Sequence, residues 1–433
     1  MLISEALSES NGRLAIGGTD VISLCEEFDT PLYIMDEALI RKHCRIFKDS
    51  LVKYYGENSC CAFASKAFSC VYMYKILKEE GLGADVVSGG ELHTANLAGL
   101  PMNRVYFHGN NKSDKEIDLG VRLGVGRFVV DNIDELKRLD RSASNQGKVL
   151  DISFRIKPGI DAHTHEFIRT GQIDSKFGVA LETGEAYDFV EAALSMKNVR
   201  LVGVHCHIGS QIFEIEPFML AARVLVNFIR EVKKRFNHEI SEINLGGGFG
   251  IKYLTAHDPI PLEECIKAIA ETVKNAVEEA GIIPPRLVLE PGRSIVGPAG
   301  ITVYKVGCVK NIPGVRNYIS VDGGMADNPR YILYRSEYEA VLPARPSAER
   351  TTLYTVAGKC CESGDLLIKD IMLPEVKAGD YLAVLATGAY NYSMASNYNR
   401  IPRLPVIMVN NGSVKVAVRR ETYDDLVICD AID

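Results

Sequence analysis

The sequence predicts a (β/α)8 barrel joined to an all-β domain. Up to about residue 298, short runs rich in Val, Ile and Phe alternate with amphipathic helical patterns. Beyond this point, β-like runs follow one another across turns without a long helical pattern. In the first part, polar and glycine-rich clusters come directly after the apolar runs, where a barrel of this kind places its chemistry.

Eight apolar runs are the predicted strands of the barrel. They are short and apolar, as expected of parallel strands that are covered on both faces. Eight repeats favour a closed barrel over an open sheet. The runs cover residues 60–64, 84–87, 105–108, 127–130, 149–156, 201–206, 242–245 and 287–289, and the helical patterns include residues 133–139, 187–194, 218–236 and 262–280.

The remaining chain is predicted to form the β domain. Asn411-Gly412 between two β-like runs favours a type I′ hairpin turn, because Asn-Gly readily adopts positive φ angles. The opening segment, with TPLYI at residues 30–34, is also strand-like and is expected to join this domain. We therefore predict a barrel over residues 37–298 and a β domain made of residues 1–36 and 299–433. The β-like runs cover residues 301–309, 318–321, 351–356, 381–385, 407–409 and 414–418.

Composition argues against several classes of protein. The hydrophobic share of 47% and the charged share of 24% are ordinary for a soluble globular protein of 433 residues. A net charge of −7 gives no reason to expect nucleic acid or an anionic membrane as a partner, and no apolar run approaches membrane-spanning length. The eleven cysteines form no C-x-x-C pair, and no signal-like stretch follows Met1. We expect a reducing cytoplasm and no metal site.

Lys66 and Glu290 predict the chemistry of the barrel. Lys66 follows the first apolar run, and an amine at the mouth of a packed strand can form an imine with a carbonyl cofactor. Glu290 follows the eighth run, where a buried carboxylate is costly unless it is paired. A pyridinium nitrogen would suit it, because the protonated ring then acts as an electron sink. The alternative is an ordinary salt bridge between Glu290 and Arg293.

Glycines and a hydroxyl predict a phosphate site near the last strands. Residues 246–250 read GGGFG, and glycines let backbone N–H groups approach a phosphate closely. Ser210 offers a hydroxyl after the sixth run, next to them in a barrel. Each cluster alone is equally compatible with a tight turn.

Three other polar residues lie at or near predicted strand ends. His207 offers a flat ring that can stack on the cofactor, and Arg155 and Asp85 can bond its ring hydroxyl and orient Lys66. A lone histidine such as His207 is more often a satisfied core or surface residue. Arg155 and Asp85 are equally compatible with ion pairs at the mouth of the barrel.

Nearly the whole chain resembles the diaminopimelate decarboxylase family, which belongs to the alanine-racemase-fold group of pyridoxal phosphate enzymes together with ornithine and arginine decarboxylases. HTHEFIRTG at residues 163–171, followed by SKFG at residues 175–178, resembles the diaminopimelate type and differs from the ornithine enzymes. The other matching motifs, in order, are TPLYI at residues 30–34, FASKA at 63–67, HCHIGSQ at 205–211, EPGR at 290–293 and CESGD at 361–365.

The resemblance implies decarboxylation of meso-2,6-diaminopimelate to L-lysine and CO2, with pyridoxal 5′-phosphate held by Lys66. Cys361 would protonate the carbon after CO2 leaves, and Glu362 would contact the distal amino group. Both would reach the site of the partner subunit in a homodimer. The other implied roles are ring stacking by His207, binding of the ring nitrogen by Glu290, phosphate binding by Ser210, Gly247, Gly248, Gly292, Arg293 and Tyr390, and substrate binding by Arg293, Arg330, Tyr334 and Tyr390.

Alternative functions stay open at this stage. A decarboxylase of carboxynorspermidine, ornithine or arginine would share the fold, and a racemase would need a second base that CESGD argues against. A catalytically inactive homologue is opposed by the retained Lys66 and Cys361. The chain departs from the family pattern at Lys359 and Tyr331, where proline is usual, and at Ile401, where arginine is common.

Overall fold

The computed structural model describes residues 2–159 and 176–431. The chain divides into two compact units, each assembled from separate stretches. The barrel unit consists of His43–Gly250 and Pro259–Gly292, and the β unit consists of Met1–Lys42, Ile251–Asp258 and Arg293–Asp433. Each candidate site residue therefore belongs to one of the two units.

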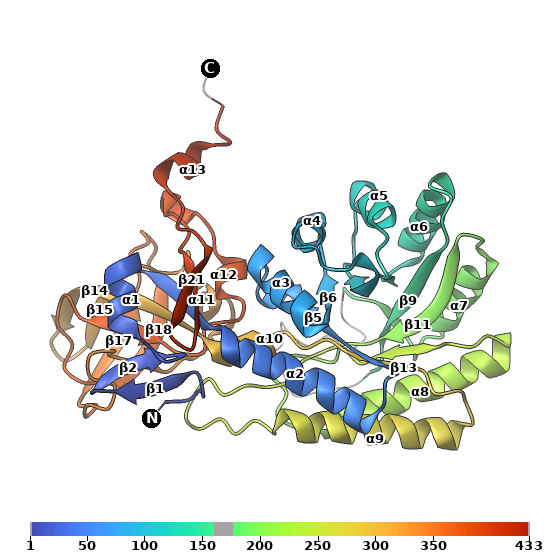
Figure 1. Cartoon of the computed structure of the whole chain (residues 1–433), viewed down its shortest axis with the longest axis horizontal. Coiled ribbons are helices and arrows are strands. Elements are labelled where there is room, and N and C mark those ends of the chain that lie inside the picture. Colours follow the sequence, from blue (N-terminus) through green and yellow to red (C-terminus); the bar gives the residue numbers. More distant parts are fainter. Residues whose placement is uncertain (1, 160–175, 432–433) are drawn as a thin grey trace. The chain divides into compact units, whose positions relative to one another are not determined.

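Eight parallel strands form a closed barrel within the described residues of the barrel unit (Figure 1). They are β5 (Ser59–Ala64), β6 (Gly83–Val86), β7 (Val105–Phe107), β8 (Arg127–Val130), β9 (Leu150–Lys157), β11 (Val199–His205), β12 (Glu242–Asn244) and β13 (Arg286–Leu289). The ring closes because β13 pairs with β5 and β8 pairs with β9. The short β10 (Val179–Ala180) pairs with β9. The eight strands overlap the eight predicted runs, so the predicted barrel is confirmed.

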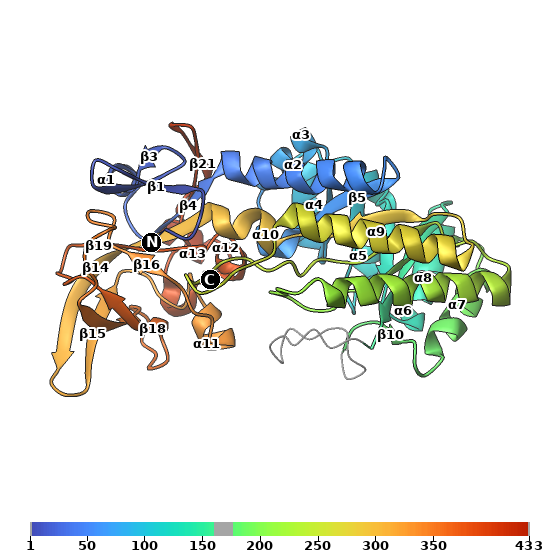
Figure 2. The ribbon, with the colours of Figure 1, turned by 90° about the horizontal axis from the view of Figure 1, so that it is seen from below.

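Helices surround the barrel. They are α3 (Val71–Glu80), α4 (Gly89–Leu97), α5 (Asp114–Leu123), α6 (Ile133–Asn145), α7 (Glu185–Ser195), α8 (Glu216–Phe236) and α9 (Leu262–Ala280), and α2 (Glu37–Tyr54) precedes β5. Consecutive helices from α3 to α9 pack against each other, and Figure 2 shows α8 and α9 side by side. In the part of the chain that the structure describes, no helix has both the length and the apolar character to cross a membrane.

Helix caps fix the loops that follow the strands. Ser113 begins α5 in a reciprocal capping box with Glu116, and Asn132 begins α6 by accepting a hydrogen bond from the backbone N–H of Glu135. Gly124 ends α5 with a φ of 75°. The caps at Ser113 and Asn132 set the connections at the carboxyl ends of β7 and β8, and Gly124 sets the turn that leads to the amino end of β8.

A buried lysine ties two of these connections together. Nζ of Lys112, a residue that is 2% exposed, donates to the carbonyl oxygens of Gly109 at 3.0 Å and Val129 at 2.9 Å. It also donates to Oε1 of Glu135 at 2.6 Å, so all three ammonium protons have acceptors. The loops after β7 and β8 are thereby held to each other at the carboxyl end of the barrel.

The β unit is built around a sheet that joins both ends of the chain. β4 (Leu32–Asp36) pairs antiparallel with β14 (Gly300–Ile312) and parallel with β20 (Val406–Asn410), as expected for the strand-like opening segment. Asn411 and Gly412 connect β20 to β21 (Ser413–Val418) with φ angles of 48° and 86°, which is the predicted hairpin turn. The other strands of this sheet are β15 (Arg316–Val321), β16 (Ala340–Val341), β17 (Thr352–Ala357), β18 (Leu366–Leu373) and β19 (Tyr381–Val384).

The opening segment also contains a helix that its strand-like pattern does not predict. α1 (Val21–Phe28) begins at Asp20, whose carboxylate accepts hydrogen bonds from the backbone N–H groups of Ile22 and Ser23. A small sheet of β1 (Leu7–Ser10), β2 (Arg13–Ile16) and β3 (Thr19–Asp20) precedes this helix. The short helices later in the β unit are α10 (Arg293–Val296), α11 (Arg330–Tyr334), α12 (Asn391–Met394) and α13 (Tyr423–Val427).

Candidate active site

Lys66 is the exposed residue of a short turn, Ser65–Ala67, at the carboxyl end of β5. Close contact with the loop after β13 places this turn. The backbone N–H of Ala64 donates to the carbonyl oxygen of Pro291 at 3.0 Å. A Cβ on Gly292 would lie 2.9 Å from Cβ of Ala64 and 3.1 Å from Cβ of Ala67. The glycine of EPGR therefore allows the lysine turn and the Glu290 loop to approach each other.

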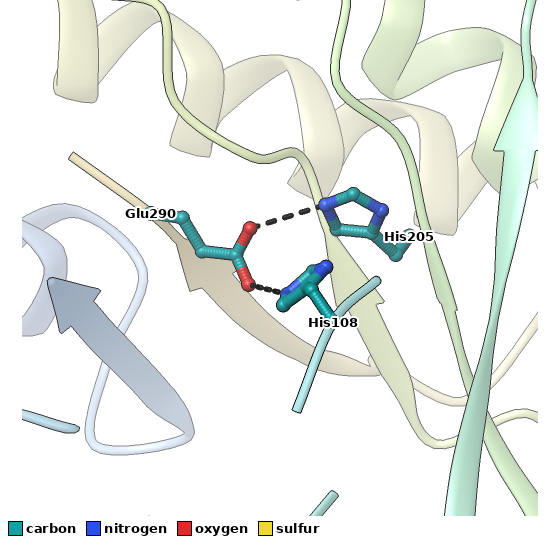
Figure 3. A group of neighbouring side chains, drawn as sticks. All are labelled: His108, His205 and Glu290. Atoms are coloured by element: carbon teal, nitrogen blue, oxygen red, sulfur yellow. Dashed lines mark hydrogen bonds and ion pairs between the residues drawn. The ribbon is translucent and has the colours of Figure 1, made fainter. Parts of the chain in front are cut away.

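Glu290 accepts hydrogen bonds from three side chains in the barrel interior, and Figure 3 shows those from His108 and His205. Oε1 accepts from Nε2 of His108 at 2.8 Å and from Nδ2 of Asn244 at 2.7 Å, and Oε2 accepts from Nε2 of His205 at 3.1 Å. The two imidazoles come from different strand ends, since His108 follows β7 and His205 ends β11. Glu290 itself is only 5% exposed.

Burial and these contacts determine the charge states of Glu290, His205 and Asp85. Burial by itself raises the pKa of Glu290, but the imidazoles of His108 and His205 bring this pKa well below its usual value. Burial lowers the pKa of His205 to about 4 despite the carboxylate beside it. Burial raises the pKa of Asp85, whose Oδ1 lies 3.8 Å from Nε2 of His108. An ionised Glu290 and a neutral His205 are therefore favoured at neutral pH.

His108, His205 and Glu290 also have the residue types of a metal site, with potential ligand atoms within 4.8 Å of one another. The direct hydrogen bonds and the additional amide donor of Asn244 account for the cluster as a carboxylate surrounded by N–H groups.

The glycine run after β12 leaves no room for side chains. A Cβ on Gly247 would lie 2.1 Å from the carbonyl oxygen of Glu290, and one on Gly248 would lie 2.5 Å from that of Gly209. Gly246 and Gly248 have φ angles of 67° and 112°, which also favour glycine. The chain segment after β11, which contains Ser210, contacts this run, because the backbone N–H of Ile212 donates to the carbonyl oxygen of Gly248 at 3.0 Å. We call this closely packed run the glycine cradle, and phosphate binding by it stays a prediction.

His207 and Arg155 lie in the same unit as this cradle. Nδ1 of His207 accepts a hydrogen bond of 3.4 Å from the backbone N–H of Gly247. Burial lowers the pKa of His207 well below its usual value, and the charges of Lys66 and Arg155 lower it further. A neutral ring is thus favoured, and a neutral ring suits stacking on a cationic heteroaromatic group.

Arg155 is placed by the segment that follows the undescribed stretch. Its guanidinium carbon lies 4.2 Å from the ring centroid of Phe177. The backbone N–H of Gly178 donates to Oδ1 of Asp131 at 2.9 Å, and a Cβ on Gly178 would lie 2.5 Å from the carbonyl oxygen of Arg155. Phe177 and Gly178 of the SKFG motif thus contact Arg155, whereas residues 163–171 and Ser175 lie outside the described residues.

The β unit contains a second group of candidate residues, centred on two buried guanidiniums. Arg293 is 8% exposed, its Nη1 donates to the hydroxyl of Tyr253, and its guanidinium carbon lies 4.7 Å from the ring centroid of Tyr390. Arg330 is 7% exposed, and its guanidinium carbon lies 5.3 Å from the ring centroids of both Tyr390 and Tyr334. Burial disfavours the charge of Arg330, but the nearby tyrosines raise its pKa above the usual value.

Cys361 and Glu362 are exposed on a loop of the β unit. The backbone N–H of Cys361 donates to Oδ1 of Asn399 at 2.8 Å. The buried carboxylate of Asp365 accepts from the backbone N–H groups of Cys360 and Met325, both at 2.7 Å. The last residue of CESGD therefore anchors the loop, and the thiol of Cys361 is presented to solvent.

The structure places the predicted residues in these two groups. Lys66, Gly247, Gly292 and the other barrel residues lie at the carboxyl ends of the strands, and the tyrosines and arginines of the β unit cluster around Tyr390. His108, Asn244 and Tyr253 were missed by sequence reasoning. The signal for His108 was its position at the end of the third apolar run, which matches that of Glu290 at the end of the eighth.

Comparisons with known proteins agree with this geometry. Residues 37–297 match the family described as "Pyridoxal-dependent decarboxylase, pyridoxal binding domain". Over 420 residues the chain is 48% identical to a diaminopimelate decarboxylase of Bacillus subtilis, covering 97% of this chain and 95% of that protein. It is 44% identical to one from Staphylococcus aureus, with 97% and 98% covered.

This chain belongs to the diaminopimelate decarboxylase family. Its fold resembles the crystal structure of a diaminopimelate decarboxylase from M. jannaschii in co-complex with L-lysine, with a TM-score of 0.92, 36% identity, and 100% of this chain and 99% of that chain covered. A Helicobacter pylori diaminopimelate decarboxylase complexed with L-lysine gives a TM-score of 0.86 at 31% identity, with 94% and 98% covered. The predicted family, fold and pyridoxal cofactor are confirmed.

Proposed function

We propose that this chain decarboxylates meso-2,6-diaminopimelate to L-lysine and CO2 with pyridoxal 5′-phosphate. The observation that carries the proposal is the match to diaminopimelate decarboxylases over 97% of the chain, joined to a barrel mouth that holds a lysine, a glycine cradle and a buried ionised carboxylate. L-lysine, the proposed product, is named in three of the similar crystal structures.

The barrel residues fit the cofactor group by group. We assign Lys66 as the amine that takes up the aldehyde, the cradle of Gly247 and Gly248 as the phosphate site with Ser210, and Glu290 as the partner of the ring nitrogen. The glycine run packs closely against the loops after β11 and β13 with no space for a Cβ, and Glu290 is an acceptor without a lysine or arginine ion pair among the described residues. When bound, pyridoxal phosphate supplies an electron sink for the charge left at the substrate carbon.

The remaining barrel residues are assigned to orienting the cofactor ring and Lys66. Nδ1 of His207 accepts from the backbone N–H of Gly247, and we assign its ring to stacking on the cofactor. Arg155 and Asp85 are assigned to the ring hydroxyl and to the orientation of Lys66. Of these groups only Asp85 is buried, so its charge interactions are less screened by water than those of Lys66.

The β unit supplies groups for anionic and cationic parts of the substrate. Arginine's planar fork binds a carboxylate bidentately, so the buried Arg293 and Arg330 are suited to carboxylates and to phosphate oxygens. Tyr334 and Tyr390 lie against Arg330 and offer hydroxyl groups. Glu362 is an exposed carboxylate suited to the distal ammonium group.

Cys361 is assigned as the proton donor that completes the reaction. A thiol can give its proton to the carbon from which CO2 has left, and the exposed position on an anchored loop suits a group that must approach a substrate. We propose that Cys361 and Glu362 serve the partner subunit of a homodimer in a reducing cytoplasm. Mixing inactive Lys66→Ala and Cys361→Ala proteins should then restore part of the activity, and no recovery after confirmed subunit exchange would contradict sharing.

The substrate is the point on which the alternative decarboxylases differ. Purified protein with added pyridoxal phosphate should release CO2 from meso-2,6-diaminopimelate and far less from ornithine, arginine or carboxynorspermidine. The similarity to a lysine/ornithine decarboxylase of Vibrio vulnificus, at 23% identity and a TM-score of 0.77, concerns the fold alone. Faster release from any of these three competitors would overturn the proposed substrate. Absence of release from all four would favour the inactive homologue.

A further inference from the structure

Three side chains that the proposed function does not use surround the Glu290 carboxylate. His108, His205 and Asn244 all donate to it, and all are at least 96% buried. Lys112 holds the loop after β7 through the carbonyl oxygen of Gly109, which is the residue next to His108. A buried polar network of this extent is costly to build unless every member is satisfied or serves a ligand.

One member is not fully satisfied. Nδ1 of His205 has no hydrogen-bond partner in the described structure, although the side chain is 1% exposed. A second ring proton would be buried there without an acceptor, so the neutral ring with its proton on Nε2 is favoured. This tautomer makes Nε2–H a donor to Oε2 of Glu290, in agreement with their distance of 3.1 Å.

The carboxylate oxygens are used unequally. Oε1 accepts two hydrogen bonds, from His108 and Asn244, whereas Oε2 accepts only the one from His205 among the described residues. A carboxylate oxygen offers two lone pairs. Oε2 therefore keeps one acceptor position, and its orientation is set by His205.

The negative charge of Glu290 also lacks a lysine or arginine partner among the described residues. His108 lies 2.8 Å from Oε1 of Glu290 and 3.8 Å from Oδ1 of Asp85, so a single imidazole is shared by two carboxylates. A buried carboxylate with this arrangement is suited to one further donor that carries a positive charge.

We propose that His108 and His205 are positioning residues, which hold the Glu290 carboxylate through two Nε2–H donors so that Oε2 keeps one acceptor position for the ring nitrogen of the cofactor. The proposal rests on the proposed function, because it needs a pyridine ring in the barrel. Asn244 has a different part, since its Oδ1 also accepts from the backbone N–H of Gly246 at 2.9 Å. Asn244 thus links Glu290 to the glycine cradle.

The test compares two ligands that differ only at the ring nitrogen. Pyridoxal 5′-phosphate and its 1-deaza analogue, in which CH replaces the nitrogen, are titrated calorimetrically into the full-length protein freed of cofactor. The wild type should bind pyridoxal phosphate about tenfold or more tightly than the analogue. In His205→Phe this preference should fall to roughly twofold or less, with the affinity for the analogue changed by less than about threefold.

Additional variants separate positioning from general damage. His205→Gln keeps an N–H donor and should retain most of the preference, and His108→Phe should lose it as His205→Phe does. Asn244→Leu should weaken both ligands because it also releases Gly246 of the cradle. The matched control is Tyr106→Phe, which removes one donor from Glu242, a buried carboxylate at the amino end of the same barrel, and should leave the preference unchanged.

Two results would overturn the proposal. Equal losses of affinity for both ligands in His205→Phe and His108→Phe, with circular dichroism showing folded protein, would mean that the histidines only support the fold. Failure of the wild type to bind either ligand would instead overturn the proposed function, and the positioning role with it.

Discussion

Two buried glutamates lie at opposite ends of the same barrel, and their partners differ. Glu242 is the first residue of β12, at the amino end, and accepts from Nε and Nη2 of Arg127 at 2.9 and 3.0 Å and from the hydroxyl of Tyr106 at 3.0 Å. Glu290 follows β13, at the carboxyl end, and is surrounded by two imidazoles and an amide.

The difference shows how one fold uses the same residue type for two purposes. A bidentate guanidinium matches the charge of Glu242 within the protein, so this carboxylate needs no further partner. Glu290 has donors that hold it in place but no arginine or lysine ion pair among the described residues. Its charge is therefore available to a ligand, at the end of the barrel where active sites are found.

The different roles of Glu290 and Glu242 are tested most directly by removing the charge of each carboxylate in turn. Glu290→Gln should lower kcat/KM roughly 1000-fold, because a preorganised charge opposite the reacting system is lost. Glu242→Gln should instead reduce the free energy of unfolding by about 3 kcal/mol, because it leaves Arg127 partly buried without its main partner. Steady-state kinetics and urea unfolding of both variants check this. Similar kinetic losses in the two variants would remove the distinction between the two ends.

Cys361 of the β unit provides a contrast to Glu290, because its removal should lower kcat without changing cofactor affinity. Cys361→Ala should lower kcat by about 100-fold, as expected when a positioned proton donor is removed. Cofactor affinity should stay nearly unchanged, in contrast to Glu290→Gln. Cys308→Ala, which removes another exposed thiol from the same unit, is the matched control and should keep wild-type kcat. An unchanged kcat in Cys361→Ala would show that another group donates the proton.

Acidification should lower the free energy of unfolding through His205, at the carboxyl end of the barrel. Its pKa in the folded protein is about 4, below the ordinary 6.5, so between these values the unfolded chain binds a proton that the folded chain does not. Stability from this group is present above pH 6.5 and is lost as the pH falls towards 4. From pH 7 to pH 5, wild type should lose about 2 kcal/mol more than His205→Gln.

Far-UV circular dichroism in urea measures this difference, since the chain contains no tryptophan. The variant and wild type should respond alike between pH 7 and pH 8, where both folded and unfolded states have a neutral imidazole. An equal loss in both proteins on acidification would contradict a neutral, buried His205.

Much of the fold could be predicted because the relevant signals are local. Each barrel strand is a short apolar run, and Asn411-Gly412 determines its own turn. α1 was missed, since its start depends on the side chain of Asp20 rather than on a long periodic pattern. Lys66 and the glycine run could be found from their places after strands. His108 and Asn244 could not be linked to Glu290, because they meet it only when β7, β12 and β13 close into one barrel.

The most direct test is to locate the cofactor on the chain. Borohydride reduction of the purified protein with bound pyridoxal phosphate, followed by mass mapping of its peptides, should find the pyridoxyl group on the peptide that contains Lys66. The label should be absent from Lys66→Ala. An unmodified Lys66, or a label on another lysine such as the buried Lys112, would contradict a pyridoxal site at the carboxyl end of the barrel.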